Sequence, residues 1–320
     1  MKIGVIGTGS WGTALVKVLT ENGHFVKWYV HESHTIPLFL QNQSNPFHFP
    51  EIKLNFQLIT LHENNQDIFV DTELILLACP SAYLNFNLKN IFAEHFKNHF
   101  VVSAIKGFIG EKALFVSEYL AENFEVAPQQ FAVLSGPSHA EEVIQQMITF
   151  LQWGSVGNYF SIFEQPYLQI RSTKDYLGLQ LAGILKNVYA IALGIVKGMD
   201  YGDNLQAALT TAASNETMQI FRSLNYSVDN FLQYGYLGDL LVTAYSPHSR
   251  NRRFGIGIGQ GKEVNSIFKE LKTIPEGYFT LQQLPKKLNI NDFSILRFTL
   301  ECIQKPQNAK EYLKKLLNRL

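Results

Sequence analysis

From Met1 to about Ser172 the chain alternates short apolar runs with stretches of helical spacing. Apolar runs rich in aliphatic, β-branched or aromatic residues suit burial on both faces of a sheet, so they predict strands. The expected strands are Lys2–Ile6, Phe25–Val30, Leu74–Ala78, Phe100–Ile105 and Phe131–Leu134. Strands that alternate with helices are typical of a parallel sheet with crossover connections. The stretch Gln41–Asn65, rich in Asn, Gln, Pro and Phe, breaks this alternation and is interpreted as an excursion after the second strand.

Beyond Ser172 the pattern becomes helical. Apolar residues recur at helical spacing in Tyr176–Lys197, Leu205–Leu224, Asn251–Gly259, Ser266–Lys272 and Ala309–Leu320. We therefore predict an α/β domain over residues 1–172 and an all-α domain over residues 173–320. The segment Tyr176–Met199 has the length of a membrane span, but polar residues interrupt it, and these are costly in lipid. We interpret it as a buried helix and expect no stable membrane insertion.

Composition narrows the function classes. The 320 residues include 27 Lys plus Arg and 27 Asp plus Glu, so the formal net charge is zero. Nucleic-acid binding usually needs a clustered positive excess, so any phosphate recognition must be local. Cys79 and Cys302 are far apart and form no Cys-x-x-Cys, which favours a reducing compartment. The apolar run after Met1 is too short for a signal peptide, and we expect a cytoplasmic protein.

A glycine-rich motif follows the first predicted strand. Gly7-Thr8-Gly9-Ser10-Trp11-Gly12 opens a helix that should run to about Asn22, with Gly23 as its stop signal. In this context Gly7 permits a tight turn, Gly9 lets the backbone approach a diphosphate, and Gly12 allows close packing of helix and sheet. This motif predicts a Rossmann-type dinucleotide-binding domain. The alternative is a glycine turn in an α/β fold that binds no nucleotide.

The end of the second strand carries a mixed signal about the cofactor. An acidic residue there favours the ribose 2′-hydroxyl of NAD, whereas a 2′-phosphate favours a basic neighbour. Here the sequence is Val30-His31-Glu32, which leaves NAD(H) and NADP(H) both open. We interpret His31 as a neighbour of the ribose or adenine; the alternative is a histidine in a surface loop.

Two later strands end in polar or small residues. Lys106 follows one of them, and Gly136 and Ser138 belong to a small-residue loop after the next. Ligands of open α/β sheets bind beyond the carboxyl ends of the strands, so Lys106 is expected to face a ligand. The alternative is a solvated loop lysine.

Lys186, followed by Asn187, lies within an otherwise apolar helical segment. A lysine in this setting often extends along its stem to water, which is the simpler interpretation. The apolar flanks and the adjacent amide favour a buried polar site instead. A desolvated lysine near other cations has a lowered pKa and can act as a general acid or base near neutral pH.

The densest polar cluster lies between Gly238 and Gly255. It includes Asp239, Thr243, Ser249, Arg250 and Asn251. Arg250 offers a bidentate fork, Ser249 and Asn251 are neutral donors, and a helix that begins here would point free N–H groups at a phosphate. The alternative is a solvated, arginine-rich helix start, which fits Arg252 and Arg253 better than Arg250. His95 and His99 have i, i+4 spacing, but their surroundings favour an ordinary amphipathic helix, and no metal is expected.

Taken together, these motifs resemble the bacterial NAD(P)-dependent glycerol-3-phosphate dehydrogenases over nearly the whole length. The resemblance rests on the glycine-rich motif with Thr13-Ala14-Leu15, Lys106-Gly107, Leu134 to Ser138, Leu185 to Val188, the glycines 194, 198 and 202, Gly238-Asp239-Leu240, Ser249 to Gly255, and Glu276-Gly277. It implies interconversion of dihydroxyacetone phosphate and sn-glycerol 3-phosphate with NAD(H) or NADP(H), supplying phospholipid synthesis. It also implies a helical half like that of 6-phosphogluconate dehydrogenase. The expected partner is a small phosphate substrate and not nucleic acid; a homodimer is left open.

The resemblance assigns site residues position by position. Beside Gly7, Gly9 and Gly12, the implied cofactor contacts are Ser10, Trp11, His31, Lys106, Ala140, Arg250, Ile274 and Glu276. The implied substrate contacts are Lys106, Gly136, Ser138, Lys186, Asp239, Ser249, Arg250 and Asn251. The implied catalytic residues are Lys186, Lys106, Asn187, Asp239 and Thr243, with Lys186 as the proton carrier.

The chain departs from the family at Thr211-Ala212-Ala213, where relatives commonly have Thr-Arg-Gly. Whatever that arginine does in relatives is absent or compensated here. Two alternative functions share the first motif: a reductase of another β-hydroxy or keto acid, and a cofactor-binding sensor without catalysis. The first would not need the Ser249-Arg250-Asn251 cluster, and the second would not need Lys106, Lys186 and Asp239 together.

Overall fold

The computed structural model describes residues 1–158, 161–226 and 230–320. The chain divides into two compact units, which are described separately below. The N-terminal unit comprises residues 1–110 and 114–176, and the C-terminal unit comprises residues 111–113 and 177–320. The division at Tyr176 comes after the last strand and at the start of the first long helix.

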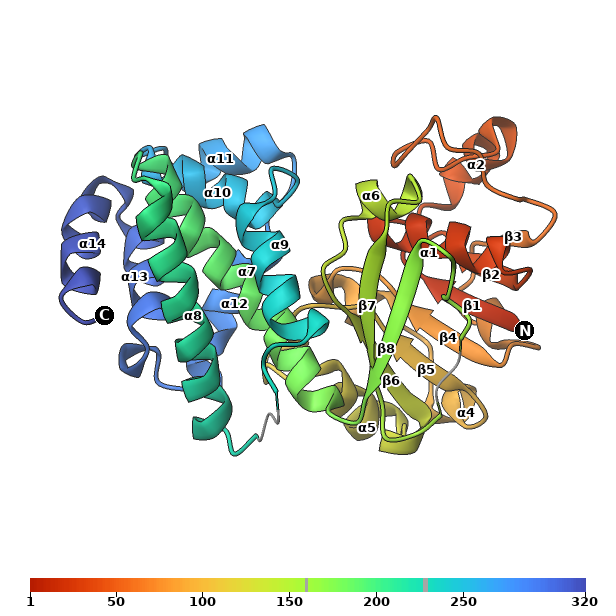
Figure 1. Cartoon of the computed structure of the whole chain (residues 1–320). Coiled ribbons are helices and arrows are strands. Elements are labelled where there is room, and N and C mark those ends of the chain that lie inside the picture. The colour runs from red at the N-terminus through yellow and green to blue at the C-terminus, as the bar shows by residue number, and fades with distance from the viewer. Residues whose placement is uncertain (159–160, 227–229) are drawn as a thin grey trace. The chain divides into compact units, whose positions relative to one another are not determined.

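The N-terminal unit is built on an eight-stranded sheet (Figure 1). Its strands are β1 (Lys2–Ile6), β2 (Phe25–Tyr29), β3 (Ile59–His62), β4 (Leu74–Leu77), β5 (Phe100–Ser103), β6 (Phe131–Ser135), β7 (Thr149–Gly154) and β8 (Leu168–Thr173). They lie in the order β3-β2-β1-β4-β5-β6-β7-β8. Neighbours are parallel except β6 and β7, which are antiparallel. Because the chain moves outward from β1 to β3 and then returns to β4, the strand order reverses between β1 and β4, where such sheets bind ligands.

All five predicted strands are confirmed, with ends that agree within two residues. The prediction missed β3, β7 and β8. β3 lies inside Gln41–Asn65, so this stretch is not wholly an excursion: it contributes an outer strand that pairs with β2. The antiparallel pairing of β7 also departs from the predicted parallel sheet.

Short helices complete the N-terminal unit: α1 (Ser10–Glu21), α2 (Ile36–Asn42), α3 (Leu84–Asn87), α4 (Ala93–Phe96), α5 (Val116–Phe124) and α6 (Ala140–Ile144). The apolar face of α1 packs into the core, where Leu15 and Trp28 are fully buried. α1 ends as predicted, because Asn22 caps it and Gly23 follows with φ of 74°. In that left-handed conformation a glycine avoids the steric cost of a Cβ.

The C-terminal unit is built of helices joined by loops, and no strand lies among its described residues, as predicted. Its helices are α7 (Tyr176–Gly198), α8 (Asp203–Ser223), α9 (Asp239–Tyr245), α10 (Arg250–Gly259), α11 (Val264–Leu271), α12 (Glu276–Gln283), α13 (Ser294–Gln304) and α14 (Ala309–Leu317). Of the described helices, only α7 is long and apolar enough to cross a membrane, and its most apolar window is entirely buried within the structure. α7 is therefore the buried helix that the sequence predicted.

Glycines let α7 and α10 approach until their backbones touch. A Cβ on Gly194 would lie 2.2 Å from the Arg252 carbonyl oxygen, and one on Gly255 would lie 2.1 Å from the Ile191 carbonyl oxygen. Gly198 and Gly259 repeat this contact one turn further along each helix. The close approach fixes the start of α10 relative to the middle of α7, where Lys186 and Asn187 lie.

Candidate active site

The glycine-rich turn, residues Gly7–Gly9, links β1 to α1. Gly7 has φ of 127°, and a Cβ there would lie 2.5 Å from the Ala78 carbonyl group. A Cβ on Gly12 would lie 2.2 Å from the Gly7 carbonyl oxygen. The tight turn predicted at Gly7 and the close packing predicted at Gly12 are thus confirmed as local geometry.

The same turn fits a dinucleotide. No described atom lies within 4 Å of a Cβ built on Gly9, so this side of the turn is open to a ligand. Gly9 is also the N-cap of α1, whose N-terminus favours an anion. Trp11 Nε1 is buried and has no hydrogen-bond partner among the described residues, so this N–H beside the turn can donate to a ligand.

His31 and Glu32 follow β2 and are both exposed. The His31 ring meets Phe86 edge to face, with ring centroids 5.3 Å apart. An exposed imidazole beside an exposed aromatic ring can receive a nucleoside. This strand end therefore presents both an acid, which favours NAD, and a basic ring, which favours NADP.

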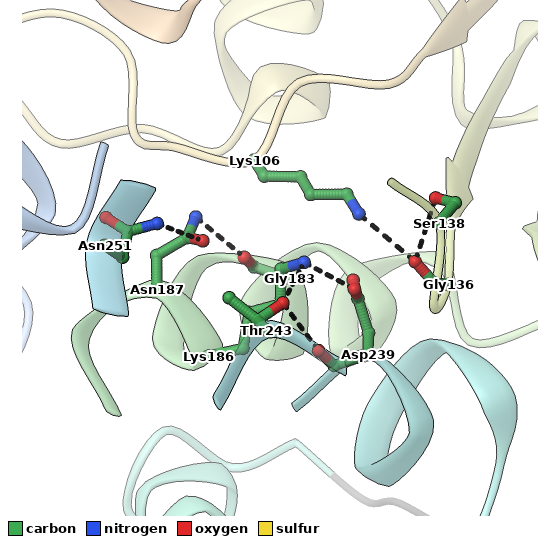
Figure 2. A network of polar contacts seen from close by, with 9 residues as sticks. All are labelled: Lys106, Gly136, Ser138, Gly183, Lys186, Asn187, Asp239, Thr243 and Asn251. Atoms are coloured by element: carbon green, nitrogen blue, oxygen red, sulfur yellow. Dashed lines mark hydrogen bonds and ion pairs between the residues drawn. The ribbon is translucent and has the colours of Figure 1, made fainter. Parts of the chain in front are cut away.

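Lys106 and the small-residue loop meet at one edge of the sheet. β5 and β6 are parallel neighbours, so the segments that follow them, with Lys106 and Gly136, lie close together. Lys106 Nζ donates to the Gly136 carbonyl oxygen at 3.4 Å, and Ser138 Oγ donates to the same oxygen at 3.1 Å (Figure 2). Ala140, another implied contact, is buried as the first residue of α6.

Lys186 lies at the centre of a buried group in the C-terminal unit (Figure 2). The residue is 8% exposed, and its ammonium group forms an ion pair with Asp239 Oδ1. Lys186 Nζ also donates to Thr243 Oγ1 at 2.8 Å, and that hydroxyl donates in turn to the Asp239 carbonyl oxygen at 2.7 Å. Asp239 and Thr243 are one turn apart on α9, so both side chains face α7.

This environment changes the electrostatic prediction for Lys186. The sequence suggested other cations as neighbours, but the partners found here are a carboxylate and a hydroxyl. A buried ammonium is tolerated when a carboxylate compensates its charge, and the carboxylate favours the protonated form. The Asp239 carboxylate thus compensates the charge of Lys186 in its ammonium form, which is the form that can donate a proton.

A chain of amides ties α7 to α10 and α12. The Gly277 N–H donates to Asn251 Oδ1 at 2.9 Å, Asn251 Nδ2 donates to Asn187 Oδ1 at 2.9 Å, and Asn187 Nδ2 donates to the Gly183 carbonyl oxygen at 3.3 Å. A backbone N–H at one end and a backbone carbonyl at the other fix the orientation of both side-chain amides. Asn251 thus bridges α7 and α12 with its oxygen and one N–H, and its contact with the substrate stays a prediction.

The arginine-rich cluster forms the start of α10, as predicted. Ser249 is the N-cap, and its Oγ accepts from the Arg252 N–H at 3.2 Å. Arg250 is exposed in the first turn, where the helix N-terminus also favours an anion. Of the remaining implied cofactor contacts, Glu276 begins α12 and Ile274, two residues earlier, is 42% exposed.

Some features were missed or differ from the sequence interpretation. Asn45 is fully buried and hydrogen-bonds to the glycine-rich turn, although no motif surrounds it. The amphipathic helix predicted to carry both His95 and His99 is shorter than expected, because α4 spans only Ala93–Phe96 and His99 lies beyond it. Both imidazoles instead pack edge to face on Phe69.

The fold, the glycine-rich turn and the buried group around Lys186 together define a class of protein. This class has a dinucleotide-binding α/β unit followed by a helical unit with a buried, carboxylate-paired lysine, as in nucleotide-dependent dehydrogenases. Comparison with known families makes this specific. Residues 2–158 match the N-terminal family model of NAD-dependent glycerol-3-phosphate dehydrogenase, and residues 175–314 match its C-terminal model. The chain belongs to this family.

Similar proteins span the full length. Glycerol-3-phosphate dehydrogenase [NAD(P)+] of Staphylococcus carnosus is 36% identical, over 99% of this chain and 98% of that protein. The Fusobacterium nucleatum enzyme of the same name is 32% identical, over 100% and 97%. The crystal structure of glycerol-3-phosphate dehydrogenase from Coxiella burnetii has the same fold, with a TM-score of 0.89 at 24% identity over 98% of both chains.

Proposed function

We propose that this chain catalyses the NAD(P)-dependent interconversion of dihydroxyacetone phosphate and sn-glycerol 3-phosphate. The observation that carries the proposal is the buried Lys186–Asp239–Thr243 group in a chain that belongs to the family over both units. A sensor that only bound a cofactor would not need to bury a lysine against a carboxylate, because burying the two charges is costly.

In the reduction, the ketone carbon gains two electrons and one hydrogen, and the carbonyl oxygen gains a proton. When bound, NAD(P)H supplies the hydride equivalent and leaves as NAD(P)⁺. The protein must therefore bind the dinucleotide, orient the ketone and protonate its oxygen. In the reverse direction the same groups remove the hydroxyl proton.

Lys186 is the proposed proton donor. Asp239 keeps it protonated before reaction, and Thr243 fixes the direction of one N–H, because the hydroxyl proton of Thr243 is already directed to the Asp239 carbonyl oxygen. After transfer, the neutral amine of Lys186 can take the proton back in the oxidation direction. General acid catalysis of this kind contributes about 10²- to 10⁴-fold to the rate.

Lys106 and Asn187 are proposed to stabilise negative charge on the substrate oxygen. Lys106 carries a positive charge at the end of the sheet, and its contact with the Gly136 carbonyl oxygen directs the side chain along the loop that holds Ser138. Asn187 is held by the amide chain described above, so its amide is oriented before the substrate arrives.

Arg250 is proposed to bind the substrate phosphate together with the start of α10. Its exposed guanidinium can form two parallel hydrogen bonds to phosphate, and Ser249 keeps the helix start in place. We infer that Asn251 supports this site through its bridge to Asn187. We further propose that the reaction takes place in the cytoplasm and that its product supplies phospholipid synthesis.

The test is a substrate panel with the purified full-length protein. Oxidation of NADH and of NADPH is followed separately by nicotinamide absorbance, with dihydroxyacetone phosphate or with a β-keto acid. We expect turnover with dihydroxyacetone phosphate and at least one cofactor. Turnover only with the keto acid would favour the alternative reductase, and no turnover with either cofactor would overturn the assignment as an enzyme.

A further inference from the structure

The carbonyl oxygens of the glycine-rich turn are all held from the protein side. Donors from three separate segments contact them: Trp28 Nε1 to Gly7 O at 2.9 Å, Asn45 Nδ2 to Thr8 O at 2.8 Å, and Thr13 Oγ1 to Gly9 O at 2.9 Å. Trp28 lies on β2, Thr13 lies on α1, and Asn45 comes from the polar stretch Gln41–Asn65. Three consecutive peptide groups are thus oriented by side chains.

The orientation of each carbonyl determines the direction of the next N–H. In a trans peptide group the C=O and N–H bonds point in opposite directions, and the described chain has no cis peptide bond. Carbonyls held toward the protein therefore direct the N–H groups of Thr8, Gly9 and Ser10 the other way. None of these N–H groups has a hydrogen-bond partner in the described part of the chain. Successive N–H groups directed outward at a helix start form an anion-binding site.

Asn45 controls the middle peptide group, between Thr8 and Gly9. Its residue is 0% exposed, and its Oδ1 accepts from the N–H groups of Phe47 and His48 at 3.0 and 3.2 Å. An oxygen must face those two donors, so the amide nitrogen must face the turn. Nδ2 then donates both to Thr8 O and, at 2.8 Å, to Thr13 Oγ1.

We propose that Asn45 is a positioning residue for the dinucleotide: it holds the Thr8–Gly9 peptide group with the Gly9 N–H directed at the diphosphate. Gly9 borders this peptide group and has no Cβ to hinder its rotation, and a rotated group would present a carbonyl oxygen to an anion. Asn45 prevents the rotation, and through Thr13 it also supports the neighbouring peptide group. The inference rests on the proposed function, because it requires a bound NAD(P)H.

The chain provides a matched control in Asn65. This asparagine belongs to the same polar stretch, is 9% exposed, and also donates through Nδ2 to two acceptors, the carbonyl oxygens of Asn87 and Lys89 at 2.9 and 2.7 Å. None of its bonds reaches the glycine-rich turn. Asn65→Ala therefore removes a similar buried amide without releasing the turn.

The test measures binding of NADH and NADPH to the full-length protein by fluorescence, without substrate. For Asn45→Ala we expect the Kd of the preferred cofactor to rise about 10- to 100-fold, the range for losing a hydrogen bond to a charged group. Displacement by ADP, which has a diphosphate, should weaken in parallel, whereas displacement by adenosine should not. For Asn65→Ala we expect a Kd within about twofold of wild type at a comparable loss of thermal stability.

A second pair of variants keeps the proposal testable if Asn45→Ala does not fold. Thr13→Val keeps the shape but removes the hydroxyl that accepts from Asn45, so it should weaken NADH and ADP binding in the same way. Thr13→Ser keeps the hydroxyl and should restore binding. The inference would be overturned if Asn45→Ala or Thr13→Val bound the cofactor with the same Kd as wild type. It would also be overturned if Asn65→Ala weakened cofactor binding as much as Asn45→Ala does. Failure of the wild type to bind either cofactor would instead overturn the proposed function.

Discussion

At the scale of single residues, the central feature is the compensated charge of Lys186. A buried lysine without a partner would be strongly destabilising, and the carboxylate of Asp239 offsets that cost. The sequence predicted the buried lysine and its carboxylate, because each stands out in its local segment. The proposed mechanism also has Asp239 orient or electrostatically tune Lys186, but the contact itself could not be predicted from the sequence, since it depends on how α9 packs against α7.

Arg250 gives the sharpest prediction for substrate recognition. Arg250→Ala should raise the KM for dihydroxyacetone phosphate about 10- to 100-fold, because a charge-assisted contact to phosphate is lost. The kcat/KM for dihydroxyacetone, which has no phosphate, should stay near the wild-type value. Arg253→Ala is the matched control, since this exposed arginine lies on the same helix. An unchanged KM in Arg250→Ala would contradict the phosphate role.

His99 predicts a specific pH dependence of stability. Burial lowers the pKa of His99 below its usual value near 6.5, with backbone hydrogen bonds opposing the shift. The unfolded chain therefore binds a proton that the folded chain does not, between the lowered pKa and about 6.5. The contribution of His99 to stability is complete above pH 6.5 and is lost as the pH falls through that window.

Urea unfolding of wild type and His99→Phe at several pH values tests this assignment. Phenylalanine keeps the aromatic contact with Phe69 but cannot titrate. We expect the free energy of unfolding of the wild type, relative to the variant, to decrease as the pH falls from about 7 to 5. A constant difference across that range would show that His99 does not titrate differently on folding.

At the scale of elements, the local pattern of apolar residues was sufficient to predict some strands but not others. The five predicted strands are short, largely apolar runs, and their ends were predicted within two residues. β3 and β8 are outermost strands with mixed polar composition, so they resemble loops in sequence. The antiparallel direction of β7 depends on pairing with distant β6. Asn45 was missed for a related reason: only the folded chain brings it to the glycine-rich turn.

The contact between α7 and α10 can be tested at the same scale. Gly194→Ala should destabilise the protein by about 1–3 kcal/mol, the usual cost of overpacking, because the added Cβ would lie 2.2 Å from the Arg252 carbonyl oxygen. Activity should fall as well, since the contact positions Asn251 near Asn187. Gly202→Ala is the control, because no described atom lies within 4 Å of its added Cβ. Chemical denaturation should distinguish the two, and equal stability would refute the packing argument.

At the scale of the whole molecule, the zero net charge conceals local sites of charge. The motifs predicted the α/β unit, the helical unit and the family resemblance, and the comparisons confirm all three. The sequence could not predict the amide chain from Gly277 to Gly183 or the hydrogen bond from Asn45 to the glycine-rich turn. Both depend on tertiary contacts between segments far apart in the chain. Ala212, where the resemblance led us to expect arginine, is half-buried on α8, and nothing in the structure explains that departure.

The most direct measurement is the steady-state rate of dihydroxyacetone phosphate reduction by Lys186→Ala, with cofactor binding measured in parallel. We predict that turnover falls about 10²- to 10⁴-fold while the Kd of the cofactor stays near that of wild type. Lys197→Ala, an exposed lysine on the same helix, should keep wild-type turnover. Near-normal turnover in Lys186→Ala would contradict the account.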